Sequence, residues 1–131
     1  MSYTCTPRVG GFTVKTPLAG TVDAGEAVKI ATTGATECGD GETMFGIALQ
    51  SGVSGDTIAV WFGGIFSGTA AAGVDFAIGD RVYLAAQASG LTRFDTGSAT
   101  NLSAGIIVET NPASAGEIFV LHDPQGLFAH A

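Results

Sequence analysis

The feature that most constrains the fold of this chain is an internal echo, in which a glycine, an acidic residue and an alternating strand occur twice. The first copy, residues 25–30, reads GEAVKI, and the second copy, residues 79–84, reads GDRVYL. Later segments are echoed in the same order, residues 45–49 by 104–108 and residues 54–60 by 115–121. The spacing between the copies is not constant, which excludes a solenoid of fixed period. The echo therefore predicts two fused or interlocked copies of one small β unit.

The echoed strands also predict which side chains are buried. Side chains two residues apart lie on the same face of a strand, so the apolar positions of both copies are expected to face the core. These expected core residues are Val28, Ile30, Val82 and Leu84. Glu26 and Asp80 follow the glycines directly, and we expect both carboxylates to lie at the strand starts, largely in solvent.

Turn-forming residues recur at intervals of roughly ten residues from Thr21 onward, a spacing typical of a β-barrel or β-sandwich. The one helix candidate, the alanine-rich run at residues 69–72, is too short to form a stable helix. We therefore predict an all-β fold, a small barrel or sandwich built from two repeated strand units. The expected strands are residues 26–31, 44–50, 57–67, 80–86, 91–94, 103–110 and 117–122.

The first 20 residues differ from the rest of the chain. Residues 1–11 have no hydrophobic period, residues 10–11 are two glycines that suggest a hinge, and Pro7 and Pro17 restrict strand pairing. We therefore divide the chain into an N-terminal arm (1–20), a β domain (21–122) and a C-terminal tail (123–131). Aromatic residues and arginine dominate interface energetics. The expected partner-binding residues of the arm are Tyr3, Arg8 and Phe12.

Composition excludes several classes of function. Only 13% of the residues are charged and the net charge is −7, with five scattered basic residues, whereas nucleic-acid binding requires clustered Lys and Arg. No apolar run approaches the ~20 residues needed to cross a membrane, and the N-terminus lacks a signal-peptide pattern. We expect a soluble, unprocessed protein made inside the cell, with no nucleic-acid or membrane partner.

One short motif suggests catalysis, and its surroundings argue against it. Residues 94–99, FDTGSA, match the signature of aspartic proteases, in which two such aspartates share a proton. Here Arg93 precedes the motif, and the usual hydrophobic partner strand is missing downstream. We interpret Asp95 as part of an exposed polar loop without a carboxylate partner.

Other reactive residues form no recognisable catalytic or metal-binding pattern. His122 and His130 lie near the C-terminus without a nucleophile, and residues 39–42 lack the acidic spacing of a calcium loop. Cys5 and Cys38 are too few and too far apart for a disulfide framework or a zinc site, and are interpreted as free thiols. We therefore predict no enzymatic activity, no cofactor and no metal.

The repeated pattern resembles a known family. Residues 24–28, 45–48, 54–60, 64–66, 78–83 and 103–107 are similar to segments of the capsid cement, or decoration, proteins of tailed bacteriophages. This group was long carried as a domain of unknown function and sometimes mislabelled as a recombinase. The resemblance covers about residues 20–122 in the right order, and the sequence departs from the family in its longer arm before Thr16 and in the tail from residue 123.

The resemblance implies a virion protein that binds the outer surface of an assembled capsid and clamps neighbouring major capsid proteins together. It implies partners of two kinds, the major capsid protein and other copies of this chain in a trimer or similar cluster, and synthesis in the host cytoplasm. Two alternatives remain open. One is another β-rich phage subunit, such as a tail tube or head fibre base. The other is a carbohydrate-binding module, which would require exposed Trp61 and Tyr83, although the apolar run at residues 58–62 favours a buried Trp61.

Overall fold

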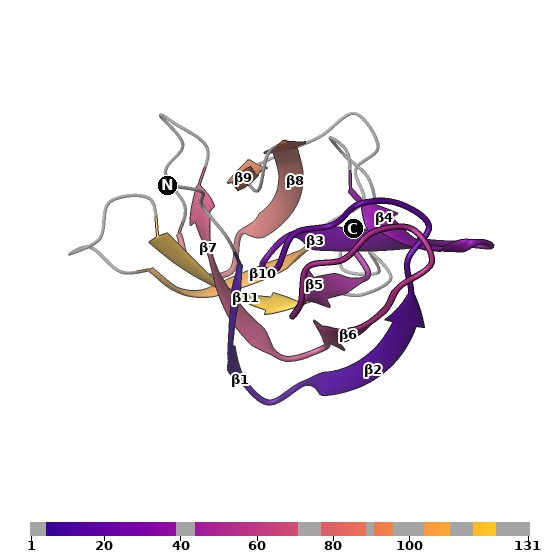
Figure 1. Ribbon diagram of the computed structural model, residues 1–131. Coiled ribbons are helices and arrows are strands. Elements are labelled where there is room, and N and C mark those ends of the chain that lie inside the picture. Colours follow the sequence, from indigo (N-terminus) through magenta and orange to yellow (C-terminus); the bar gives the residue numbers. More distant parts are fainter. Residues whose placement is uncertain are drawn as a thin grey trace.

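The computed structural model describes residues 5–38, 44–70, 77–88, 91–95, 104–110 and 117–122, which form eleven β-strands in two sheets (Figure 1). Within these ranges there is no helix, and consequently none of a length and hydropathy that would cross a membrane. The prediction of an all-β fold is confirmed, and of the two architectures left open the structure has the sandwich-like one.

The two sheets divide the chain roughly in half. The N-terminal sheet has the order β2-β6-β5-β3-β4, and the C-terminal sheet has the order β1-β7-β11-β10-β8-β9. The strands of the N-terminal sheet are β2 (Phe12–Pro17), β3 (Ala27–Ala31), β4 (Gly34–Glu37), β5 (Gly46–Ala48) and β6 (Thr57–Phe62). Those of the C-terminal sheet are β1 (Thr6–Val9), β7 (Ile65–Ala70), β8 (Arg81–Ala88), β9 (Leu91–Asp95), β10 (Gly105–Thr110) and β11 (Glu117–His122).

Apart from β1, the sheets repeat the same arrangement strand by strand. β2, β6, β5, β3 and β4 correspond in order to β7, β11, β10, β8 and β9. Each sheet also curls back on itself through a parallel contact, between Leu18, just after β2, and Ala35 of β4 in one sheet and between β7 and β9 in the other. The prediction of two repeated strand units is therefore confirmed, and β1 has no counterpart among the described strands of the N-terminal sheet.

Individual hydrogen bonds repeat as well. The backbone N–H of Gly25 donates to the Ala48 carbonyl, and that of Gly79 donates to the Ile107 carbonyl, with N···O distances of 2.7 and 2.8 Å. In the same way Val28 and Val82 accept from Phe45 and Ala104, respectively. These pairs agree with the sequence echo, so the echo reflects matching backbone geometry.

The glycine-acid pairs have one local structure. Gly25, Gly55 and Gly79 have φ values of 90°, 96° and 93°, in the region that favours glycine. Each occupies the third position of a turn typical of type II, closed by the N–H of the following acidic residue. The acidic side chain accepts a hydrogen bond from the first residue of the turn at 2.7–2.9 Å. A glycine is needed for the backbone, and the acid closes the turn.

The core has two parts. The larger cluster joins the two sheets and includes Met44, Trp61, Phe66 and Ile107, all buried. The smaller cluster lies within the curl of the N-terminal sheet and consists of Leu18, Val22, Val28, Ala35, Ala48, Ile58 and Val60. Because the larger cluster takes side chains from both halves of the chain, neither half can bury its apolar surface alone.

Two of the predicted burial assignments are wrong. Ile30 is 49% exposed, because β5 pairs with β3 at Ala27 and Val28, and beyond these residues β3 continues in a hairpin with β4 (Figure 1). Glu26 is only 1% exposed, because its side chain folds back over the turn. Val28 and Val82 are buried as expected, and the side chain of Leu84 lies outside the described residues.

Candidate partner-binding surface

The N-terminal segment, residues 5–17, forms one edge of each sheet. β1 pairs with β7 at one edge of the C-terminal sheet, and β2 pairs with β6 at one edge of the N-terminal sheet. Cys5, just before β1, belongs to the larger core cluster. The division into an arm, a domain and a tail stays a prediction. Within the predicted arm, however, residues 5–17 are integrated into the sandwich.

Arg8 is held over the outer face of the C-terminal sheet. Its Nε donates a hydrogen bond to Ser67 Oγ on β7 at 3.0 Å, and a terminal guanidinium nitrogen lies 3.8 Å from Glu117 Oε2 on β11. The ion pair is partly exposed, so its own contribution to stability is small, about 0–1 kcal/mol. Its effect is to fix the direction of the Arg8 side chain.

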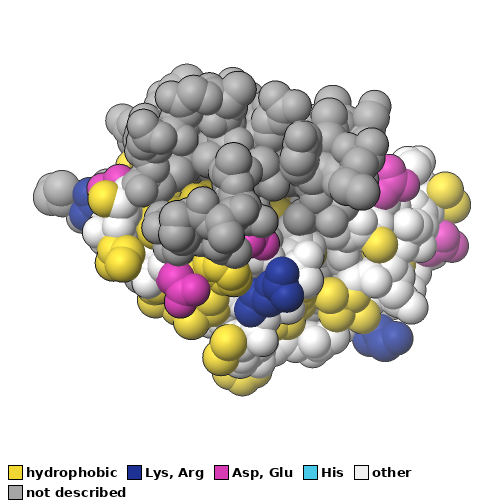
Figure 2. Space-filling view, turned by 90° about the vertical axis from the view of Figure 1, so that its left-hand side faces the viewer, with side chains coloured by type: hydrophobic (Ala, Val, Ile, Leu, Met, Phe, Trp, Pro, Cys, Tyr) yellow, Lys and Arg dark blue, Asp and Glu magenta, His cyan; other side chains and the backbone are white. Residues whose placement is uncertain are grey.

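A groove of about 380 Å³ opens beside Arg8 on this outer face. Its lining is mostly apolar, with charged groups among the apolar side chains: Arg8, Val9, Ile65, Val108, Glu109 and Phe119. Seen from the side on which β1 and β7 lie in Figure 1, hydrophobic side chains gather around single charged ones (Figure 2). An apolar surface interrupted by a few charges is typical of a protein-binding surface.

Phe12 begins β2, and its aromatic side chain is 68% exposed. Its ring lies 5.7 Å from that of Phe62, which in turn stacks on Phe45 at 5.2 Å, so three aromatic rings form a row. The row supports Phe12 from one side and leaves its other side in solvent. Phe12 thus presents an exposed apolar ring that is packed against its neighbours on one side.

The two glycines between β1 and β2 form a bend that contacts the core, and their role as a hinge stays a prediction. Gly10 and Gly11 have φ values of 63° and 86°, and the Gly10 carbonyl accepts a hydrogen bond from Trp61 Nε1 at 3.0 Å. A Cβ atom on Gly11 would lie 2.5 Å from the same Nε1 atom. The buried indole therefore holds the bend and leaves no room for a side chain.

The structure thus places two of the three predicted contact residues. Arg8 lies on the edge strand of one sheet and Phe12 on the edge strand of the other, and the bend at Gly10 and Gly11 joins the two strands. Tyr3 lies outside the described residues. Sequence reasoning missed the exposed apolar neighbours Val9 and Val14, which extend the apolar surface on either side of the bend.

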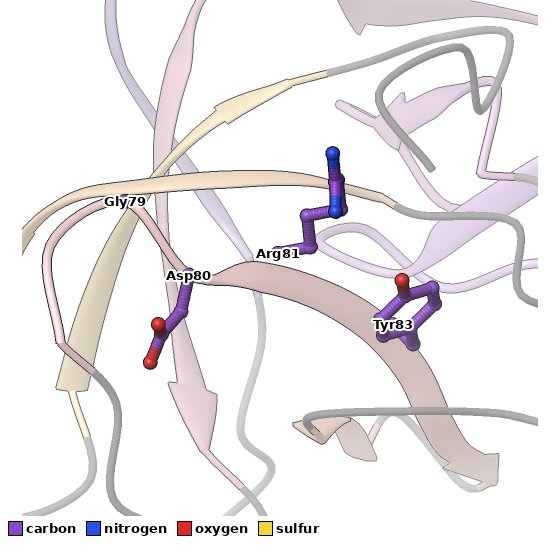
Figure 3. Close-up of a pocket in the computed structure, with 4 residues that line it drawn as sticks. All are labelled: Gly79, Asp80, Arg81 and Tyr83. Carbon is purple, nitrogen blue, oxygen red and sulfur yellow. The ribbon is translucent and has the colours of Figure 1, made fainter. Parts of the chain in front are cut away.

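A second cavity, of about 370 Å³, is lined by Gly79, Asp80, Arg81 and Tyr83 (Figure 3). Asp80 points away from Arg81, and its Oδ2 accepts a hydrogen bond from the Ala77 N–H at 2.8 Å. The carboxylate therefore serves the turn that begins β8.

The most perturbed carboxyl group of the described chain is one that sequence reasoning had placed in solvent. Burial, and then the neighbouring carboxyl of Glu37, raises the pKa of Glu26 to about 7, while the hydrogen bond from the Asp23 N–H acts in the opposite direction. Glu26 Oε1 accepts that bond at 2.7 Å, and its Oε2 has no conventional hydrogen-bond partner. Near neutral pH this side chain is therefore poised between its neutral and charged forms.

Two other residues considered for catalysis or binding have structural surroundings. His122 is buried, where its Nδ1 accepts from the Gly63 N–H at 2.8 Å and its Nε2 lies 2.9 Å from the Met44 carbonyl. These contacts assign the ring proton to Nε2. Trp61 stacks on this ring with centroids 6.0 Å apart. Trp61 is buried, as the sequence favoured, and so is Tyr83, so neither offers the stacking platform of a carbohydrate-binding module.

The remaining features considered in the sequence are the Asp95 motif and possible metal sites. The backbone of Asp95 ends β9, and its side chain and the residues that follow lie outside the described part of the chain. Across the described ranges, no three His, Cys, Asp or Glu side chains gather in a way that would hold a metal ion.

Comparison with known proteins adds one finding. The family model described as phage cement protein matches residues 8–122, which include Arg8, Phe12 and every described strand from β2 to β11. A search of curated proteins found no match.

Proposed function

Because the chain belongs to the phage cement protein family, we propose that it binds the outer surface of an assembled phage capsid and cements neighbouring major capsid proteins. Its proposed partners are the major capsid protein and other copies of itself, in a trimer or similar cluster. It would be made in the host cytoplasm and reside on the virion. The proposed role is structural, without catalysis.

The observation that carries this proposal is the run of exposed apolar side chains on the N-terminal segment. Val9 and Phe12 are 61% and 68% exposed, and both are held in place by paired strands. Fully burying such a side chain contributes about 1.5–3 kcal/mol. Many copies acting together on a lattice turn weak single contacts into firm attachment. We propose Tyr3, Arg8 and Phe12 as contact residues, with residues 1–20 as the segment that engages the capsid.

The test is binding of the purified protein to expanded, undecorated capsids, measured by co-sedimentation and imaging. We expect Phe12→Ser to reduce occupancy strongly, because the substitution removes a large apolar side chain that is 68% exposed on the N-terminal segment. The matched control is Val53→Ser, which changes an exposed apolar residue in a turn outside the N-terminal segment and should bind as the wild type does. A wild-type protein that binds phage tails and leaves capsids bare would overturn the proposal.

A further inference from the structure

The repeated architecture gives the two sheets equivalent edges, and within the described part of the chain one of these edges is covered while the other is open. β1 pairs with the outer edge of β7 in the C-terminal sheet. β2 is the counterpart of β7, and none of the described strands pairs with its outer edge at residues 13–15. β4 reaches β2 farther along, where Leu18 bridges Ala35.

Hydrogen bonds on the far side of β6 show which groups of β2 face outward. The Ala59 N–H donates to Gln50 Oε1, and the Ala59 carbonyl accepts from the Leu49 N–H, both at 3.0 Å. The N–H and the C=O of Ala59 therefore both form hydrogen bonds on the side of β6 that faces away from β2. Lys15 lies opposite Ala59, so its N–H and C=O point to the open edge, and by the alternation of an antiparallel ladder so do those of Thr13.

The covered edge shows what fits there. Val14 and Phe66 occupy equivalent positions, opposite Val60 and Val120, so Lys15 corresponds to Ser67. On β7, Ser67 pairs with Thr6 of β1 and accepts a hydrogen bond from Arg8. A short extended segment running antiparallel is thus the occupant that this geometry accepts.

The two exposed edges differ in how they are protected. The outer edge of β1 contains Pro7, which has no N–H, and a register shift between Pro7 and Val9, and both features discourage further pairing. Residues 12–16 of β2 contain neither a proline nor a register shift. Lys15 is the protecting charge on this edge, and it disfavours a basic occupant or a second β2.

We propose that the outer edge of β2 at residues 13–15 receives an extended segment of the partner capsid protein, which adds as an antiparallel strand with an acidic side chain beside Lys15. The proposal rests on the proposed function and specifies its contact. The charge follows from the comparison of the two edges. β1 brings the basic side chain of Arg8 to neutral Ser67, whereas an occupant of the β2 edge would lie beside the ammonium group of Lys15, which an acidic side chain complements.

The first experiment removes the outward N–H of Thr13 with Thr13→Pro and measures binding to undecorated capsids. Apparent affinity should fall about ten-fold or more, because the docking strand loses backbone hydrogen bonds. The control Ser54→Pro places a proline at the second position of a turn, where it is favoured, and should bind normally. If Thr13→Pro does not fold, Lys15→Glu should weaken binding while Lys15→Arg retains it.

The second experiment identifies the occupant by carbodiimide cross-linking of wild-type decorated capsids, followed by mass spectrometry. We expect a bond between Lys15 and a carboxylate of the capsid protein. A cross-link from Lys15 to another copy or to its own chain would overturn the choice of occupant. Normal binding by Thr13→Pro or by Lys15→Glu would overturn the docking edge. In both cases the proposed function stands as long as wild-type protein binds capsids and Phe12→Ser does not.

Discussion

Replacing Glu26 with glutamine should stabilise the protein at alkaline pH and have little effect in acid. In the folded state Glu26 has a pKa of about 7, so it keeps its proton at pH values below this, whereas the ordinary pKa of a glutamate is 4.5. Between these values unfolding releases a proton, so rising pH favours the unfolded state. The stabilisation linked to this proton is complete below pH 4.5 and is lost as pH rises through 7. Glutamine keeps an oxygen for the Asp23 N–H and never acquires the charge.

The size of the effect follows from the two pKa values. Each pH unit between them corresponds to about 1.4 kcal/mol, which gives about 3.5 kcal/mol as an upper limit. Glu37 is only half-buried, so water screens part of its influence on Glu26. We expect Glu26→Gln to raise the free energy of unfolding by about 2 kcal/mol at pH 8.5. At pH 4 the two proteins should agree within about 0.5 kcal/mol.

Urea unfolding followed by the fluorescence of Trp61, the single tryptophan, measures this difference between pH 4 and 8.5. The matched control is Asp56→Asn, because Asp56 makes the same turn contact, to the Val53 N–H at 2.9 Å, in an exposed position. That variant should gain nothing at pH 8.5. If wild type and Glu26→Gln lose stability in parallel across the whole pH range, the argument from burial is refuted.

Two further predictions concern packing. Gly105→Ala and Gly46→Ala should each lower the free energy of unfolding by about 2–4 kcal/mol, because a Cβ would collide with the carbonyl oxygen of Leu121 or Trp61, respectively. The control Gly20→Ala should cost less than about 0.5 kcal/mol. Urea midpoints of Gly105→Ala and Gly46→Ala equal to that of Gly20→Ala would contradict this prediction. Cys5 and Cys38 are both buried and should react with a thiol reagent only in urea. Burial, and then the nearby Cys38 thiol, also raises the pKa of Cys5, which keeps that thiol in its unreactive protonated form. Rapid reaction of the native protein would contradict this prediction and show that this part of the core opens.

The sequence predicted the fold well because its signals are local. Alternating side chains and glycine turns determine strands and their ends, and the echo placed Gly46 and Gly105 in equivalent positions before any pairing was known. The sandwich could not be distinguished from a barrel, because that choice depends on how the two curled sheets meet. The burial of Ile30 was mispredicted for a related reason, since alternation gives a face of a strand and does not give the length of the sheet beside it.

The candidate surface was predictable in its residue types and not in its geometry. Arg8 and Phe12 were identified because arginine and aromatic residues are common in interfaces, and their contact role stays a prediction. Their positions on two different sheets depend on pairing with Ser67 and Phe62, which lie far away in the sequence. Glu26 was missed because its burial requires the N-terminal segment, where the Cys5 N–H donates to the Gly25 carbonyl across the turn.

The long-range pairing of the first strands has a consequence for synthesis on the ribosome. β2 pairs with β6, and β1 pairs with β7, so neither N-terminal strand has its partner until residues 57–70 have been made. At about 5–20 residues per second, the roughly 45 residues in between take on the order of 2–9 s. During this interval the apolar side chains of Val9, Phe12 and Val14 are carried by a nascent chain whose edge strands are unpaired. The segment made first is therefore the last of the N-terminal half to be fixed, and it is the most open to misassembly when many copies are translated together.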